Sequence, residues 1–307
     1  MAFTFIDLFA GIGGIRIPFD ELGGKCVFSS EWDVHAANTY EANFGERPHG
    51  DITKIRECDI PRHDILLGGF PCQAFSIMGK MQGFADTRGT MFFEIERILR
   101  YRKPKAILLE NVKQLVGHDK GRTFNVIQDH LAELGYYMKW KILNALDFGV
   151  PQRRERVIIV GFRNKKFAER MSLDFDSIPY NLNDVLEDEK NVNPSLFASK
   201  RIVEKRKKSV AKKDVFFPSV WHENKSGNIS VLPHACALRT GASYNYQLVN
   251  GNRRFTDREL LRLQGFPDTY KIVGTNQDVR RQTGNAVCVN VIRAVATRML
   301  EILYAKA

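Results

Sequence analysis

A cysteine just after an apolar strand is the most reactive feature of this sequence. Cys72 lies in the run Gly68-Gly-Phe-Pro-Cys-Gln73, directly after the predicted strand 64–67. Backbone N–H groups stabilise a thiolate at such a turn, whereas a lone cysteine elsewhere is more often a small buried hydrophobe. Residues 73–89 add three glycines and two basic side chains. The pattern therefore predicts a nucleophile beneath a mobile, cationic loop.

One carboxylate and two arginines occupy similar positions further along the chain. Glu110 opens the run Glu-Asn-Val after the apolar residues 106–109, and open α/β sheets bind ligands beyond the carboxyl ends of their strands. Arg154 and Arg156 alternate with Glu155, so a strand would place both guanidinium groups on one face. Arginine binds phosphate or donates to a carbonyl oxygen. Each residue alone is equally typical of a solvated charge.

A glycine-rich turn and polar residues at successive strand ends predict a nucleotide-like ligand. Asp7-Leu-Phe-Ala-Gly-Ile-Gly-Gly14 ends the first apolar run, although its spacing is not that of the dinucleotide fingerprint G-x-G-x-x-G. Glu31 can accept from ribose hydroxyls, and Trp32 can stack on an adenine. Asp51 and Ile52 can contact the adenine edge. Trp32 or Asp51 alone is better explained as a core or turn residue, but together these positions predict an adenosine-bearing cofactor.

The elements that would position these residues alternate as in an α/β domain. Short apolar runs predict strands, and runs of helical periodicity between them predict helices. We therefore predict a doubly wound, mostly parallel sheet with helices on both faces. The predicted strands are 3–8, 25–30, 64–67, 106–109, 138–143 and 156–161, and the predicted helices are 14–22, 34–43, 91–101 and 123–134.

The pattern changes near Arg163 and becomes regular again near Thr256. In between, periodicity is poor, and residues 200–213 contain eight Lys or Arg in fourteen positions. Helices are predicted again at 256–263 and 286–303, and the second is long enough to pack on the first domain. We therefore predict a catalytic domain at 1–162, a smaller inserted domain of irregular or β structure at 163–252, and a returning segment at 253–307.

Composition restricts the class of protein. Of 307 residues, 44% are hydrophobic and 26% charged, as in ordinary globular proteins, and the net charge of +11 favours a polyanionic partner such as nucleic acid. No run approaches the roughly 18 apolar residues of a membrane span, and the apolar start lacks the basic residues of a signal peptide, so we expect a cytoplasmic protein. The five scattered cysteines form no C-x-x-C pair, so neither a zinc site nor a disulfide framework is expected.

In chain order, these segments resemble the motif series of the DNA (cytosine-5)-methyltransferases. Around residues 71–89 and 143–156 the chain is similar to the small bacterial HhaI-type modification enzymes. The resemblance is carried by Pro-Cys-Gln at 71–73, Glu-Asn-Val at 110–112 and Gln-x-Arg-x-Arg at 152–156. It continues with the runs Arg258–Pro267 and Gln282–Val287. It covers residues 3–162 and 245–300 and is weak between them. Three such motifs in this order are highly specific.

The resemblance implies methyl transfer from S-adenosylmethionine to carbon 5 of cytosine, with S-adenosylhomocysteine as product and no metal. Cys72 would add to carbon 6, which activates the ring, and Glu110 would bind ring N3 and the exocyclic amine. Arg156 would donate to O2, and Arg154 would lie near the thiolate and the phosphate or carbonyl oxygens. A stacked base is out of reach, so the cytosine would flip out of the duplex under loop 73–89.

The resemblance also implies the cofactor and DNA contacts. The inserted segment would be the target-recognition domain, and its run 200–213 would contact phosphates, or equally form a solvated linker. Double-stranded DNA would be the partner of a bacterial, monomeric enzyme that shares its target with a restriction endonuclease. The chain departs from the family pattern at Ala286, where serine is usual, and at Ala237-Leu238, where Thr-Leu is frequent. The implied cofactor residues are Phe9, Gly11, Ile12, Gly13, Glu31, Trp32, Asp51, Ile52, Met91 and Asn285.

Three other functions compete with this one. An RNA methyltransferase could use the same scaffold, although the long segment between the Gln-x-Arg-x-Arg and Arg-Leu-Gln-Gly-Phe-Pro motifs fits a DNA-reading domain better. A catalytically dead DNA-binding regulator is disfavoured because Cys72, Glu110 and Arg156 are all intact. An NAD-dependent oxidoreductase is disfavoured by the glycine spacing and has no need of Pro-Cys-Gln.

Overall fold

The computed structural model describes residues 3–71 and 91–304, which fall into two compact units. The first unit comprises Met1–Leu143, Glu155–Phe175 and Ile292–Ala307. The second comprises Asn144–Arg154 and Asp176–Val291. The sequence places its boundaries at 162/163 and 252/253, so residues 253–291, which we assigned to the returning segment, fall within the second compact unit. The functional assignment of these parts stays a proposal.

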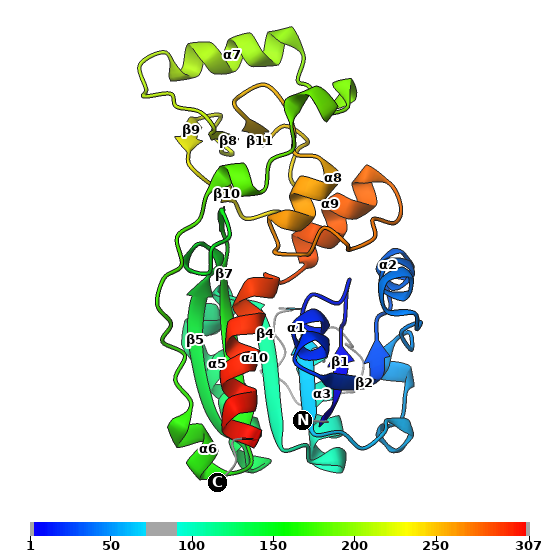
Figure 1. The fold of residues 1–307 in the computed structure, drawn as a ribbon. Coiled ribbons are helices and arrows are strands. Elements are labelled where there is room, and N and C mark those ends of the chain that lie inside the picture. Colours follow the sequence, from blue (N-terminus) through cyan, green and yellow to red (C-terminus); the bar gives the residue numbers. More distant parts are fainter. Residues whose placement is uncertain (1–2, 72–90, 305–307) are drawn as a thin grey trace, which may run out of the picture. The chain divides into compact units, whose positions relative to one another are not determined.

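A six-stranded sheet in the order β2-β1-β3-β4-β7-β5 forms the centre of the first unit (Figure 1). β1 pairs in parallel with β2 and β3, β3 pairs in parallel with β4, and β4 pairs antiparallel with β7. The strand order reverses between β1 and β3, and ligands of open α/β sheets bind at such a point. The predicted mostly parallel, doubly wound sheet is confirmed. The strands are β1 Phe3–Leu8, β2 Gly24–Ser30, β3 Ile65–Gly69, β4 Ala106–Val112, β5 Tyr137–Asn144 and β7 Glu155–Phe162.

Helices cover both faces of this sheet. On one face Phe5 of β1 packs 5.6 Å from the ring of Phe19 in α1, and Phe3 packs 5.7 Å from Tyr304 in α10. Alternate residues of β1, Ile6 and Leu8, point to the other face and pack with α3 and α5. The helices that include residues of this unit are α1 Arg16–Glu21, α2 Val34–Phe44, α3 Met91–Arg102, α4 Gln114–Gly117, α5 Arg122–Glu133, α6 Lys165–Arg170 and α10 Val289–Tyr304.

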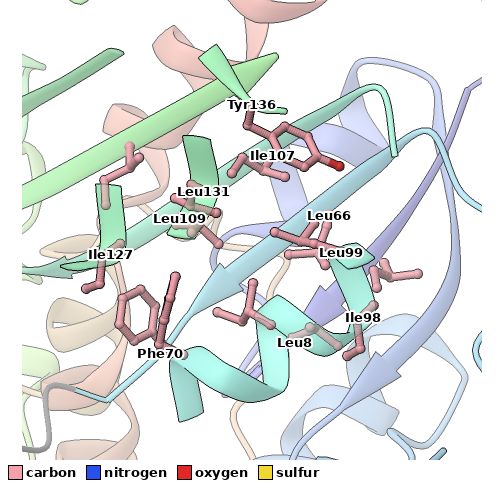
Figure 2. Packing of buried hydrophobic residues seen from close by; sticks show 14 of the residues in the cluster. Leu8, Leu66, Phe70, Ile98, Leu99, Ile107, Leu109, Ile127, Leu131 and Tyr136 are labelled. Carbon is pink, nitrogen blue, oxygen red and sulfur yellow. The ribbon is translucent and has the colours of Figure 1, made fainter. Parts of the chain in front are cut away.

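A large part of the apolar core lies between the sheet and helices α3 and α5. Figure 2 shows Leu66 and Leu109 of two central strands facing Leu99 of α3 and Leu131 of α5. Each of these four leucines is at most 1% exposed. Burial of such side chains contributes about 1.5–3 kcal/mol each, so this layer fixes the strand ends from which the candidate site is built.

The second unit combines short strands with three helices (Figure 1). Strands β11, β8 and β9 form an antiparallel sheet, and β6 pairs in parallel with β10. Capping boxes at Thr256 and Thr275 begin α8 and α9. The elements are β6 Gln152–Arg153, α7 Lys200–Val210, β8 Val220–Glu223, β9 Ile229–Leu232, β10 Ala235–Cys236, β11 Gln247–Val249, α8 Asp257–Arg262 and α9 Asn276–Asn285.

Two parts of the second unit differ from the sequence prediction. The basic run 200–213 was expected to be irregular or β, but residues 200–210 form helix α7, which buries Arg206 and Val210. Helix α9 was not predicted at all.

Short 3₁₀ turns occupy Ile52–Lys54, Glu57–Asp59, His118–Gly121, Ala145–Asp147, Leu182–Asp184, Glu189–Asn191 and Pro194–Leu196. Within the described ranges, no helix has the length and apolar character that crossing a membrane requires.

Candidate active site

The turn after β1 has an unusual backbone. Phe9, Gly11 and Gly13 all have positive φ angles, of 56°, 55° and 79°. Such an angle strains the non-glycine Phe9, and strained turns occur often at binding sites. A Cβ on Gly13 would lie 2.2 Å from the ring of Phe44, so packing against α2 already requires glycine there. A Cβ on Gly11 would meet nothing within 4 Å, so the open side of this turn is at Gly11.

Glu31, the residue after β2, is held by backbone donors from two directions. Its Oε2 accepts from the N–H of Gly11 at 2.7 Å, and its Oε1 accepts from the N–H of Asp33 at 2.7 Å. Burial raises the pKa of Glu31, and these backbone N–H groups oppose that rise. A carboxylate has about four lone-pair sites, more than these backbone donors use. The residue therefore suits an acceptor role towards the hydroxyls of a ribose.

The other predicted cofactor residues of the first unit have mixed environments. Trp32 is 74% exposed, so it is not a core aromatic and its ring is available for stacking. Ile12 and Ile52 are buried, and Met91 is half-buried at the start of α3. The Asp51 carboxylate accepts from the N–H of Thr53 at 3.0 Å, which caps the turn after it. Phe9, Gly11–Gly13, Glu31 and Trp32 thus follow neighbouring parallel strands, β1 and β2, whereas Asn285 is the last residue of α9 in the second unit.

Glu110 and Arg156 form an ion pair on adjacent strands of the sheet. The Arg156 Nε lies 2.9 Å from Oε1 of Glu110, and the two side chains are only 17% and 13% exposed. Glu110 pairs in the β3–β4 register with Gly69, where a Cβ would lie 3.5 Å from Oε2 of Glu110. The carboxylate therefore lies beside Gly69, the last residue of β3, and Cys72 follows Gly69 by three residues in the chain.

Asn111 ties this carboxylate strand to the turn that leads to Cys72. Its Nδ2 donates to the carbonyl of Phe70 at 2.9 Å, and its side-chain oxygen accepts from the N–H of Val112 at 2.8 Å. Asn111 is 2% exposed. No role was predicted for it from the sequence, although it is the middle residue of Glu-Asn-Val. Cys72 itself and loop 73–89 lie outside the described residues, so the nucleophile stays a prediction.

Arg154 does not share a face with Arg156. The strand is interrupted at Arg154, between β6 and β7, so the alternation rule fails there. The Arg154 guanidinium is 2% exposed and donates to the carbonyls of Leu238, Gly284 and Ala286, at 3.2, 3.0 and 2.5 Å. These bonds hold the second unit together. They do not support the predicted position of Arg154 beside the Cys72 thiolate.

A buried carboxylate lies below the turn after β1. Asp7 is fully buried, and within the described part of the chain neither of its oxygens has a hydrogen-bond partner. Loss of hydration raises its pKa from 3.8 to about 8, against the opposing charge of Arg16. Unfolding exposes Asp7 to water and returns the pKa to its ordinary range. Between about pH 4 and 8 the folded chain therefore holds a proton that the unfolded chain releases, so this group makes stability fall as pH rises.

We expect Asp7→Asn to remove this pH dependence. The free energies of unfolding of the variant and the wild type should be similar below about pH 4, where Asp7 is protonated in both the folded and the unfolded chain. The variant should then gain on the wild type by up to about 1.4 kcal/mol per pH unit towards pH 8. Urea unfolding at pH 5 and pH 8 measures the free energy of unfolding of both proteins. The difference between variant and wild type at each pH isolates Asp7, because the other titrating groups are common to both. Parallel pH profiles would contradict an uncharged, buried Asp7.

Known proteins match almost the whole chain. A family model described as C-5 cytosine-specific DNA methylase matches residues 3–301. The Type II methyltransferase M.HaeII of Haemophilus aegyptius is 56% identical over 300 residues, which cover 97% of this chain and 93% of that protein. M.HhaI of Haemophilus parahaemolyticus is 40% identical over 305 residues, covering 95% and 92%.

Solved structures give the same fold. A Dnmt2 variant of Spodoptera frugiperda superposes with a TM-score of 0.76 at 21% identity, covering 97% of this chain and all of that one. At that identity the likeness concerns the fold alone. The family model extends through both units, from β1 to helix α10. The chain therefore belongs to the C-5 cytosine-specific DNA methylases.

Proposed function

We propose that this chain modifies one cytosine within a specific duplex sequence, as the modification enzyme of a restriction–modification system. Membership of the family gives the reaction, which is methyl transfer to carbon 5 of cytosine in DNA. The Type II methyltransferases among its relatives support the modification role. The observation that carries the proposal for the site is the Glu110–Arg156 pair, fixed beside the turn that leads to Cys72.

The pair is complementary to the pairing edge of cytosine. That edge presents an amine donor, the acceptor N3 and the acceptor O2. Glu110 accepts from the amine and, when protonated, donates to N3, while Arg156 donates to O2. Among the described residues, the Nε of Arg156 is paired with Glu110 and its Nη1 donates to the Glu155 carbonyl, which leaves Nη2 for the base. Both groups stabilise charge that develops on the ring.

Cys72 is proposed to activate the ring. Its thiolate forms a bond to carbon 6, and the electrons of the C5–C6 double bond move towards carbon 5, with charge shared by N3 and O2. Carbon 5 thereby becomes nucleophilic. After methylation a base, which can be water, removes the carbon 5 proton. The C6–S bond then breaks and releases the Cys72 thiolate. The base must leave the helix stack for this chemistry, at a cost of a few kcal/mol.

S-adenosylmethionine is proposed as the cofactor, and it would supply an electrophilic methyl group on its sulfonium. The turn Phe9–Gly13 would approach it closely at the open side of Gly11, with Ile12 buried behind. Glu31 would accept from the ribose hydroxyls, and Trp32 would lie on the adenine. Four further residues complete the proposed set: Asp51, Ile52, Met91 and Asn285.

Helix α7 is proposed to contact DNA phosphates. Lys205, Lys207 and Lys208 are exposed, whereas Arg206 is 1% exposed and bonds the Trp221 carbonyl and Glu223, at 2.9 and 3.0 Å. Arg206 is therefore the structural anchor of a helix whose lysines face solvent. The neighbouring lysines would supply positive charge for phosphate contacts that do not depend on the DNA sequence.

We expect the double variant Lys207→Gln/Lys208→Gln to flatten the salt dependence of DNA binding. Each lost phosphate contact lowers the slope of log K against log salt by about 0.9. Fluorescence anisotropy with a duplex at several salt concentrations measures the slope. The matched control is Lys165→Gln/Lys166→Gln, which neutralises two adjacent lysines of α6 in the first unit. Equal slopes in both double variants would mean that the run 200–213 is a solvated surface that makes no phosphate contacts.

Bisulfite sequencing tests the proposed function directly. Plasmid DNA from a methylation-free host that expresses this chain should show protected cytosines at one short recurring sequence, absent with an empty vector. Soluble protein without protection would contradict the proposal. Transfer of labelled methyl groups to tRNA would then favour the RNA-modifying alternative. A partner endonuclease, a monomeric state and a cytoplasmic location stay expectations from the sequence.

A further inference from the structure

The second unit contains a basic hollow that no step of the proposed chemistry uses. It encloses about 460 Å³ of space, part of it open to solvent. Its floor is apolar and includes Leu238 and Leu260. Its walls carry three guanidinium groups and two tyrosine rings, contributed by Arg239, Arg254, Arg280, Tyr244 and Tyr246.

The three arginines carry uncompensated charge. No aspartate or glutamate lines the hollow, and none of the three guanidinium groups has a carboxylate partner within the described part of the chain. Burial raises the pKa of Tyr246, and the charges of Arg239 and Arg280 oppose that rise. A concave surface with three cations and no anion raises the local concentration of an anionic ligand.

The guanidinium groups are also held in place before any ligand arrives. The guanidinium carbon of Arg280 lies over the ring of Tyr244, 3.9 Å from its centroid, and Arg280 donates to the carbonyl of Ala242 at 3.2 Å. Arg254 lies 5.7 Å from the same ring and donates to the carbonyl of Ser195. Arg239 lies 4.9 Å from the ring of Tyr246. The side chains of Arg280 and Arg254, each bonded to a backbone carbonyl, lose less entropy on binding than the exposed lysines of α7.

We propose that this hollow binds a backbone phosphate of the DNA substrate, with Arg280 as its principal donor. The inference rests on the proposed function, since it takes duplex DNA as the substrate. Guanidinium groups match the oxygens of phosphate through paired hydrogen bonds. A phosphate held here fixes the register of the duplex on the second unit and carries no sequence information itself.

The test compares Arg280→Gln with Arg281→Gln on the same helix. Both substitutions remove one positive charge from α9, but Arg281 lies 3.5 Å from Asp278 and does not line the hollow. Binding of a fluorescent mixed-sequence duplex at several salt concentrations should give a slope about 0.9 smaller for Arg280→Gln and unchanged for Arg281→Gln. Arg239→Gln changes an exposed side chain of the hollow and should lower the slope in the same direction, whether or not Arg280→Gln folds.

Three results would decide against the hollow as a DNA site. Equal slopes for wild type, Arg280→Gln and Arg239→Gln would overturn it. If inorganic phosphate stabilises the wild type against heat but not Arg280→Gln, and the DNA slopes are equal, the hollow takes a free anion. A slope change shared equally by Arg281→Gln would show only the loss of net charge. Failure of the proposed function is a separate outcome, in which the wild type binds the duplex but transfers no methyl group to it.

Discussion

Replacing Cys72 by serine is expected to abolish methyl transfer and to leave DNA binding near that of the wild type. The reaction needs a thiolate, because carbon 5 of an aromatic cytosine is nucleophilic only after addition at carbon 6. A serine hydroxyl is hardly ionised at neutral pH and has no neighbouring base assigned to it here. The substitution changes one atom and little volume. We therefore expect a loss of several orders of magnitude in kcat.

The matched control is Cys58→Ser, since Cys58 is exposed, lies in the 3₁₀ turn Glu57–Asp59 and is assigned no role in the reaction. Labelled methyl transfer onto duplex DNA and anisotropy binding should be measured for both variants. Cys58→Ser should retain full activity and binding. Activity of Cys72→Ser close to that of the wild type would overturn the covalent mechanism. Loss of DNA binding in that variant would mean instead that Cys72 supports the structure.

The fold of the first unit could be predicted from the sequence because its signals are local. The runs 3–8 and 106–109 are apolar, and the turns that follow them carry glycine or polar residues, so strand ends and site residues are read together. The turn after β1 shows where this locality ends. Glycine at position 13 was assigned to the cofactor, but Phe44, far along the chain, already demands it by packing.

Arg154 shows what local signals miss. Its partners are the carbonyls of Leu238, Gly284 and Ala286, which lie 84 to 132 residues further along the chain, and no spacing rule reveals them. The alternation that assigned Arg154 to the face of Arg156 also presumed an unbroken strand. Instead, three long-range hydrogen bonds hold the Arg154 side chain in the interior of the second unit.

Helix α7 was missed for a different reason. Ile202, Val203, Arg206 and Val210 repeat at helical spacing, but the third of these is charged, so the apolar face is hard to recognise. Lysine and arginine are good helix formers, and the anchor Arg206 is satisfied by the Trp221 carbonyl and Glu223. A buried arginine can be recognised as part of a helix's buried face only once its partner is known.

Glu110→Gln is expected to lower kcat by about 10²- to 10³-fold, with little change in cofactor affinity. Glutamine keeps the shape and the acceptor for the cytosine amine. It cannot carry the proton that N3 needs as charge develops during thiol addition. The substitution also leaves Arg156 without its carboxylate at 2.9 Å, so the guanidinium that should meet O2 is held less firmly.

Glu155→Gln is the matched control for this substitution. Glu155 lies next to Arg156 in sequence, and its carboxylate pairs with Lys113 at 2.5 Å. Neither of these two side chains belongs to the proposed site, and the substitution keeps the Glu155 carbonyl that bonds Arg156. Single-turnover kinetics at saturating DNA, with the cofactor concentration varied, separate the rate from the affinity. A loss confined to cofactor affinity would remove Glu110 from the chemical step. A fall in rate for Glu110→Gln with the control near the wild type would instead fix the carboxylate at the base, because only there does its proton affect the addition.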